Sequence, residues 1–157
     1  MSTMRRIMGI DYGERRIGVA LSDPLGWIAR PYRVITPESE DAGLALLGEI
    51  VRAESVVKVV VGLPTDSRSQ IGDQARTVIR WARRLSRSIA VPVVFWDETY
   101  SSAAAEELAG KRAKRGRGRR PEPIDHIAAA AILQEYLDAG GAEYEPGQTL
   151  EAFAEIE

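Results

Sequence analysis

Four acidic residues stand where apolar segments of the chain begin or end. Asp11 ends one apolar run, Asp97 and Glu98 end another, and Asp125 opens a segment with helical spacing. Carboxylates that converge repel one another and lose hydration unless a cation lies among them. Because the donors would all be oxygens and the chain has no cysteine, the pattern favours Mg²⁺ or Mn²⁺ over zinc or copper.

Phosphoryl chemistry is what such a site would carry out. Two divalent ions about 4 Å apart stabilise the attacking and leaving oxygens of a phosphodiester, and the protein then supplies little beyond position and charge. Ordinary roles stay open for each acid taken alone: Asp11 in a turn, Asp125 as a helix cap, Asp97 and Glu98 at a strand end in solvent. Since side chains alternate along a strand, only one of Asp97 and Glu98 can face the site.

Two residues beside Asp125 offer further chemistry. Glu122 would supply a fourth carboxylate if the helix began early, although Pro121 and Pro123 favour a loop there. His126 is the only histidine and is placed to transfer a proton, with a plain surface position on the helix as the favoured interpretation.

Residues 111–120, which read KRAKRGRGRR, form a strongly basic segment without an acid. Its two glycines and the prolines that follow predict a loop, and a merely solvated loop is the alternative. The segment directly precedes Asp125, so we expect it to lie over the proposed site and bind phosphates without reading bases. Its basic residues are Lys111, Arg112, Lys114, Arg115, Arg117, Arg119 and Arg120.

A second basic feature is a stripe of arginines in the helix predicted over residues 69–88. Their spacing by three or four places them on one face, where a solvated surface is the alternative. We expect Arg76 and Arg80 to extend the nucleic-acid footprint. Aromatic residues make up only 6% of the chain, which favours recognition of structured nucleic acid over base stacking on single strands. The stripe consists of Arg76, Arg80, Arg83, Arg84 and Arg87.

The elements that must position these residues follow from the apolar periodicity. Turn chemistry between the first two strands predicts a hairpin, and right-handed crossovers make the later strands parallel to the first. We therefore predict an α/β fold: a mixed five-stranded sheet, with a three-strand meander plus two parallel strands, flanked by helices on both faces. Strands are predicted over residues 7–11, 16–22, 33–36, 56–62 and 91–96, and helices over 39–54, 69–88, 102–109 and 124–137.

Length and composition limit the possibilities further. The 157 residues suit one domain over residues 1–140, followed by an acidic tail, 141–157, that we expect to be flexible. The net charge of −2 conceals a basic segment and a tail that carries acids but no base. The absence of cysteine excludes disulfides, thiolate zinc sites and a cysteine nucleophile. We expect a cytoplasmic protein with no membrane partner, as a monomer or a homodimer.

Several short motifs occur in register along the chain, and together they resemble the YqgF family of Holliday-junction-resolvase-like proteins, also regarded as nucleases of pre-16S ribosomal RNA. The resemblance covers about residues 5–138. It rests on GIDYG at 9–13, RIGVA at 16–20, VGLP at 61–64, Asp97-Glu98 followed by Ser101, and Asp125 followed by Ala128-Ala129, Ile132-Leu133 and Tyr136-Leu137.

The resemblance implies a ribonuclease H-like fold and a metal-dependent nuclease that processes the 5′ end of pre-16S rRNA or resolves branched DNA. It also implies that Asp11, Glu98 and Asp125 bind the metal ions, which would be two. The chain departs from the family at Thr99, where an arginine is usual, and in lacking a lysine shortly before Asp125. Arg119 or Arg120 would replace that lysine, so the departures concern substrate binding more than metal binding.

Two other functional classes remain alternatives. One is a non-catalytic protein that binds nucleic acid or the ribosome and keeps the acids for stability. The other is an ATP-dependent domain related to sugar kinases or actin, because GIDYG also resembles their phosphate-binding hairpin. Such proteins close a second domain over the nucleotide, and we expect no second domain in a chain of this length.

Overall fold

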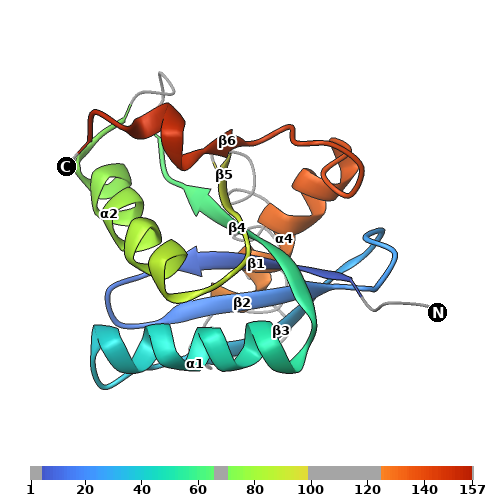
Figure 1. Cartoon of the computed structure of the whole chain (residues 1–157), viewed down its shortest axis with the longest axis horizontal. Helices are drawn as coiled ribbons and strands as arrows, with labels where there is room; N and C mark the ends of the chain where they lie inside the picture. The colour runs from blue at the N-terminus through green and yellow to red at the C-terminus, as the bar shows by residue number, and fades with distance from the viewer. Residues whose placement is uncertain (1–4, 66–70, 99–124, 157) are drawn as a thin grey trace, which may run out of the picture.

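The computed structural model describes residues 5–65, 71–98 and 125–156. One mixed sheet, with strand order β3-β2-β1-β4-β5-β6, is covered by helices on both faces (Figure 1). The predicted α/β class, the meander and the two parallel strands are confirmed. The predicted number of strands is wrong, because a short sixth strand, β6 (Gln148–Thr149), pairs with β5 at the edge of the sheet.

The meander consists of β1 (Arg6–Tyr12), β2 (Ile17–Ser22) and β3 (Ala29–Ile35). The Gly13 N–H donates to the carbonyl of Arg16 at 2.9 Å and closes the predicted hairpin. The third strand begins earlier than predicted and includes Pro31. A proline is tolerated there because β3 is the edge strand and its register shifts at this point.

Two parallel strands extend the sheet beyond the meander. Strand β4 (Val56–Leu63) pairs with β1, and β5 (Val93–Asp97) pairs with β4. Their connections contain α1 (Glu40–Ala53) and α2 (Asp73–Ser88), and α4 (Asp125–Asp138) follows later in the chain. The carboxyl ends of β1, β4 and β5 therefore meet at one edge of the sheet.

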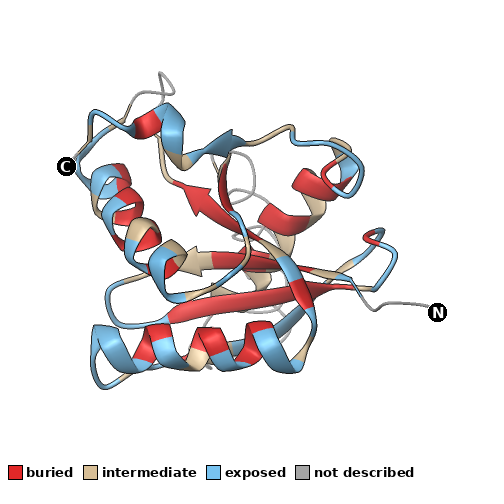
Figure 2. Ribbon diagram, viewed as in Figure 1, coloured by how far each residue is buried: buried red, intermediate tan, exposed pale blue. Residues whose placement is uncertain are grey.

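The two faces of the sheet have separate cores. Helices α1 and α2 pack on one face, over the side chains of Ile10, Val61 and Phe95. Helix α4 packs on the other face, over Val60 and Val94, and Figure 2 shows the buried residues following the sheet and the inner sides of the helices. Residues that alternate along a strand thus face different helices, which decides the side on which each acid lies.

Helix α4 approaches the sheet closely because β1 has a glycine beneath it. A Cβ atom built on Gly9 would lie 2.7 Å from Leu133 Cβ and 2.8 Å from the carbonyl oxygen of Ala129. Asp11 lies two residues beyond Gly9 on β1, so its side chain is on the same face of the sheet and points toward the same helix. None of the helices in the described part of the chain has the length and apolar character needed to cross a membrane.

The segment after residue 140, predicted to be a flexible tail, packs against the sheet up to Ile156. It forms β6 and the 3₁₀ helix η1 (Leu150–Phe153). The buried ring of Phe153 lies edge-on to Phe95 with their centroids 5.4 Å apart. The guanidinium of Arg83 on α2 donates to the backbone carbonyls of Phe153 and Ile156.

A polar network fastens the start of this segment. Lys58 Nζ donates to the hydroxyl of Tyr136 at 2.7 Å and to the carbonyl of Gly141 at 3.0 Å, and it lies 3.2 Å from Glu145 Oε1. The Tyr136 hydroxyl in turn donates to Glu145 Oε2 at 2.7 Å. Burial, together with the hydrogen bond and charge of Glu145, raises the pKa of Tyr136.

Candidate functional site

Two of the predicted acids meet above β4. Asp11 lies at the end of β1 and Glu98 directly follows β5, and their side chains are joined by a hydrogen bond that the Asp11 carboxyl donates. Gly62 of β4 lies between them, and a Cβ atom built on it would stand only 2.8 Å from Glu98 Oε2. The missing side chain at Gly62 therefore leaves the room in which Glu98 reaches Asp11 across β4.

Strand alternation separates Asp97 from this pair. Val94 and Trp96 pack on the α4 side, and Glu98 continues that side. Asp97 follows Phe95 on the opposite face and accepts a hydrogen bond from the Thr65 hydroxyl at 2.9 Å. The structure thus brings Glu98, and not Asp97, to Asp11.

Asp125 is the first residue of α4 and approaches the same place from above the sheet. Its backbone lies against Gly18, which is the cross-strand partner of Asp11. The Oδ2 atom of Asp125 is buried, accepts no hydrogen bond within the described part of the chain, and lies 3.4 Å from Nε of Arg16. The sequence did not single out Arg16 as a partner of Asp125, because that contact depends on how α4 crosses the hairpin.

The electrostatics of the site follow from burial of the carboxyl groups, to which neighbouring like charges add. Burial, followed by the charges of Glu98 and Asp125 and the hydrogen bond to Glu98, raises the pKa of Asp11 to about 7. Burial also raises the pKa of Glu98, the hydrogen bond from Asp11 opposes the rise, and the charge of Asp97 adds to it. The two carboxyl groups therefore hold one proton between them at a pH where isolated carboxyls are ionised.

The three acids predicted to bind metal are not all gathered together in the described part of the chain. Within residues 5–65, 71–98 and 125–156, no group of three or more acids or histidines stands close enough to hold a metal ion. Asp11 and Glu98 are in contact, whereas Asp125 acts on Asp11 through its charge and pairs with Arg16. The donor chemistry nevertheless fits a hard divalent cation, since the donors are oxygens and their burial leaves negative charge that a cation would offset.

The other residues predicted to act at the site divide into two groups. His126 has a buried Nδ1 to which no described residue is hydrogen-bonded. Glu122, Thr99 and the predicted helix over residues 102–109 lie outside the described residues, and so does the basic segment over residues 111–120.

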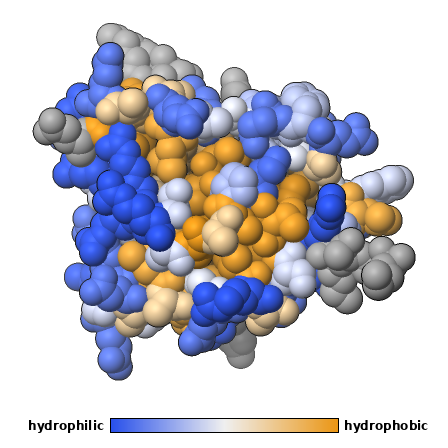
Figure 3. All heavy atoms as spheres, in the orientation of Figure 1, coloured by the Kyte–Doolittle hydropathy of each residue, from blue (hydrophilic) through white to orange (hydrophobic). Residues whose placement is uncertain are grey.

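Two of the five arginines in the α2 stripe are engaged by other segments of the chain. Arg83 points to the C-terminal segment, and Arg84 pairs with Glu40 and Asp41 at the start of α1. Arg76 and Arg80 are exposed. Figure 3 shows the outward side of α2 as a strongly hydrophilic surface beside an apolar centre.

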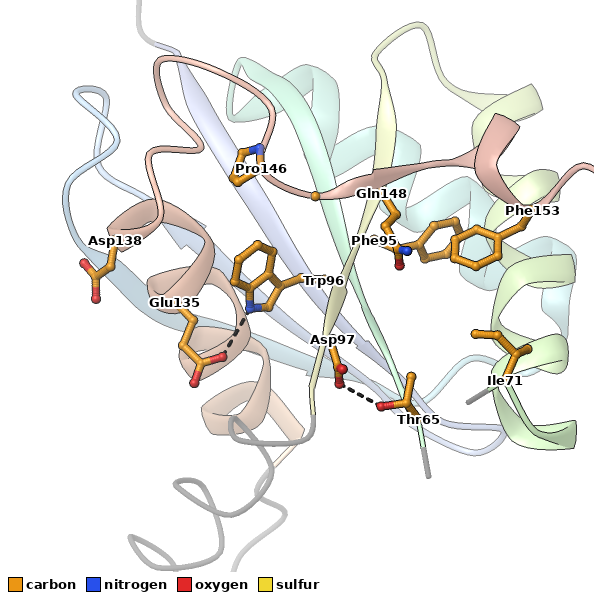
Figure 4. Close-up of a pocket in the computed structure, with 11 residues that line it drawn as sticks. Thr65, Ile71, Phe95, Trp96, Asp97, Glu135, Asp138, Pro146, Gln148 and Phe153 are labelled. Carbon is orange, nitrogen blue, oxygen red and sulfur yellow. Dashed lines mark hydrogen bonds between the residues drawn. The ribbon is translucent and has the colours of Figure 1, made fainter. Parts of the chain in front are cut away.

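A cavity of about 710 Å³ lies at the outer edge of β5, and the sequence did not indicate it. Asp97 and Thr65 contribute to its lining, as do the aromatic side chains of Phe95 and Phe153 (Figure 4). Trp96, also in the lining, donates from its indole N–H to Glu135 at 3.2 Å. Because its lining comes from separate strands, helices and loops, no sequence pattern points to it, and it includes none of Asp11, Glu98 and Asp125.

The sheet order, with acids at the carboxyl ends of its strands, defines a ribonuclease H-like fold of the resolvase type. The structure is similar to Thermus thermophilus RuvC in complex with a Holliday junction substrate, with a TM-score of 0.60, 19% identity and coverage of 90% of this chain and 99% of that one. It is also similar to the fowlpox virus resolvase in complex with Holliday junction DNA, with a TM-score of 0.52, 9% identity and coverage of 85% and 97%.

The chain belongs to the RuvX family, described as Holliday junction resolvase, whose model matches residues 5–139. A relative from Moorella thermoacetica is 45% identical over 87% of this chain and 96% of its own length, and one from Syntrophomonas wolfei is 43% identical over 88% and 99%. Both bear the name "Putative pre-16S rRNA nuclease". The resemblance to the YqgF family is confirmed, and the family is one of nucleases, which hydrolyse phosphodiester bonds.

Proposed function

We propose that this protein is a divalent-metal-dependent nuclease of structured RNA, with the 5′ end of pre-16S ribosomal RNA as its substrate. Asp11, Glu98 and Asp125 are its metal-binding and catalytic acids. The observation that carries the proposal is the hydrogen-bonded pair of Asp11 and Glu98, with the charge of Asp125 acting on it, at the carboxyl ends of parallel strands. The names of the relatives support the choice of substrate.

The ions that suit these oxygens are Mg²⁺ or Mn²⁺, two of them in the proposed active state. The chemistry supplied by such ions, when bound, is a water of lowered pKa and neutralisation of charge on the phosphodiester. Asp11 and Glu98 must give up their shared proton to bind a cation, since only ionised carboxylates are strong ligands. Asp125 would supply the third carboxylate from α4.

Substrate binding in this proposal comes from charge. The basic segment over residues 111–120 directly precedes Asp125 and would bind phosphates on either side of the scissile bond. Arg76 and Arg80 are exposed on α2, which packs on the face of the sheet opposite α4, so they would extend the footprint past the edge of the sheet where β4 ends. Contacts of this kind recognise the backbone and shape of nucleic acid.

Branched DNA is the second candidate substrate. The family description is Holliday junction resolvase, and the two structural neighbours bind Holliday junction DNA. The acids would do the same chemistry on either backbone, so the substrate must be decided by experiment.

Purified protein would be incubated with Mn²⁺ or Mg²⁺ and either labelled RNA spanning the 5′ end of pre-16S rRNA or a four-way DNA junction. We expect cleavage of the RNA at a defined position, and loss of cleavage by at least a hundredfold in Asp11→Asn, Glu98→Gln and Asp125→Asn. Asp97→Asn is the matched control, because it removes the neighbouring carboxylate from the opposite face of β5.

The outcomes separate the alternatives. Undiminished cleavage by the folded Asp11→Asn and Asp125→Asn variants would show that the catalytic assignment is wrong. Binding without cleavage by the wild type would favour the non-catalytic alternative, and cleavage of the junction alone would favour the resolvase.

A further inference from the structure

Arg16 is the last residue of the β1–β2 turn, directly before β2, and lies beside the acidic site. The hydrogen bond from Gly13 to its carbonyl holds the backbone of the turn. Its Nε lies 3.4 Å from Asp125 Oδ2, and 50% of its side chain is exposed. Arg16 is thus paired with a carboxylate of the proposed site while half of its side chain remains in contact with solvent.

The pairing occupies an atom that a metal ion would need. Asp125 Oδ2 is buried, and no described residue donates a hydrogen bond to it. Among the described residues, Arg16 is the cation that pairs with this oxygen. An ion pair with a half-exposed arginine and no hydrogen bond is weak, so it can be exchanged for a stronger partner.

We propose that Arg16 is a phosphate-binding residue that changes partner during the reaction cycle. In this structure its guanidinium pairs with Asp125. If the Asp125 carboxylate instead held a divalent ion, the guanidinium would be free to bind a phosphate beside the scissile bond. This inference rests on the proposed function, and it adds a substrate contact from the described part of the chain.

The chemistry of the side chain suits both partners. A guanidinium presents a planar set of N–H donors that fits carboxylate and phosphate oxygens alike, and it stays charged throughout. The hydrogen bond from Gly13 holds its backbone two residues before Gly18, the cross-strand partner of Asp11, and half of its side chain is exposed to solvent. No covalent step or proton transfer is required of Arg16.

Arg15 provides a matched control. It is the adjacent residue, it is exposed, and it makes no ion pair with another described residue. Arg15→Ala therefore removes the same charge from the same turn without touching Asp125. Any difference between Arg16→Ala and Arg15→Ala isolates the contact with Asp125.

The first measurement is the affinity for Mn²⁺ by calorimetry without nucleic acid. Arg16→Ala frees the Asp125 carboxylate, so we expect it to bind Mn²⁺ about threefold more tightly than Arg15→Ala does. Arg16→Gln keeps a polar, though shorter, side chain without the charge and is expected to behave in the same way. Thermal melting of each variant verifies that it is folded.

The second measurement is cleavage of the RNA and of the four-way junction. On the substrate that the wild type cleaves, kcat/KM should fall about tenfold or more in Arg16→Ala relative to Arg15→Ala, because a charge-assisted contact to phosphate is lost. Arg16→Lys, which keeps the charge, should recover part of the loss. Tighter metal binding combined with slower cleavage is not expected of a residue that merely supports the fold.

Two results would overturn the proposal while leaving the nuclease assignment intact. One is a Mn²⁺ affinity of Arg16→Ala equal to or weaker than that of Arg15→Ala, which would mean that Arg16 does not compete with the metal. The other is cleavage by Arg16→Ala at the rate of Arg15→Ala. A wild type that neither binds Mn²⁺ nor cleaves would overturn the proposed function and this exchange together.

Discussion

Gly18 lies directly against the backbone of Asp125. A Cβ atom built on Gly18 would overlap the carbonyl group of Asp125 and the amide nitrogen of His126. Gly18 is also the cross-strand partner of Asp11. Because Gly18 has no side chain, the first turn of α4 can pack directly on β2. The pairing of β1 with β2 therefore helps to set the distance between Asp11 and Asp125, two of the proposed metal-binding acids.

The substitution Gly18→Ala should lift the start of α4 from the sheet. We expect a loss of about 2–3 kcal/mol in the free energy of unfolding, as for a side chain forced into a filled core. Nuclease activity should fall further than stability explains, because Asp125 moves away from Asp11. Chemical denaturation and cleavage assays on the same preparation measure the two effects.

The control for this variant is Gly48→Ala in α1. A Cβ atom there would meet only ordinary contacts, at 3.5 Å from the Arg52 guanidinium and 3.9 Å from Ile89 Cγ2. Because alanine is the better residue inside a helix, we expect a gain of ~0.5–1 kcal/mol and full activity. A Gly18→Ala protein as stable and active as Gly48→Ala would refute the role of close packing at Gly18.

The raised pKa of Asp11 predicts an unusual pH dependence of stability. The pKa of its carboxyl is about 7 in the folded protein and 3.8 in the unfolded chain. Between these pH values the folded state therefore binds more protons than the unfolded state. Stability therefore falls as the pH rises through this window, by at most ~1.4 kcal/mol per pH unit for one proton. Asp11→Asn removes the effect, and it should be more stable than the wild type at pH 8 and similar to it below pH 4.

Denaturation curves between pH 4 and 8, in chelator, provide the measurement. Glu49→Gln, at an exposed position on α1, controls for the loss of a negative charge and should keep the slope of the wild type. Added Mn²⁺ should raise the midpoint of the wild type at pH 8 but not that of Asp11→Asn. A wild-type protein whose stability rises from pH 4 to 7 would contradict the assignment of this proton to the folded site.

The sequence was sufficient to predict that Asp11 and Asp125 approach each other, and the reason is topological. Parallel strands joined by right-handed crossovers place their carboxyl ends at one edge, and the apolar runs that define those strands are easily recognised. Alternation limited the choice to one of Asp97 and Glu98. The family resemblance favoured Glu98. The physical reason appears only in the register of β5 against β4, which places Glu98 over Gly62.

Other features depend on contacts that no local pattern encodes. β6 has only two residues, so it carries no periodicity. The spacing of the α2 arginines is that of a solvated or ligand-binding stripe, but Arg83 and Arg84 are engaged by segments distant in sequence. The pairing of Arg16 with Asp125 likewise arises from the crossing of a helix over a hairpin.

Tyr136→Phe should loosen the C-terminal segment without changing the core volume. The variant loses the hydrogen bonds that the hydroxyl makes with Lys58 and Glu145, whereas those two residues keep their own ion pair. We expect a loss of about 1–2 kcal/mol in the free energy of unfolding and faster amide exchange over residues 141–156. Tyr32→Phe is the control, because it removes an exposed hydroxyl that donates to Glu54 at 3.3 Å, away from residues 141–156. It should change exchange of that segment little, and equal exchange in the two variants would argue against the network as the anchor.

Replacing Arg115, Arg117, Arg119 and Arg120 by glutamine should weaken nucleic-acid binding and flatten its dependence on salt. Each phosphate contact that is lost removes ~0.7–0.9 from the slope of log K against log salt, so four contacts would remove about 3. The comparison is the double variant Arg30→Gln/Arg33→Gln, which removes two charges from the edge strand β3. The change in slope is divided by the number of charges removed in each variant. Long-range attraction falls off over about 10 Å at 0.1 M salt, so arginines that contact no phosphate should matter little above that concentration. A slope that is unchanged by the fourfold substitution, measured on a catalytically inactive Asp11→Asn background, would place the basic segment outside the path of the substrate.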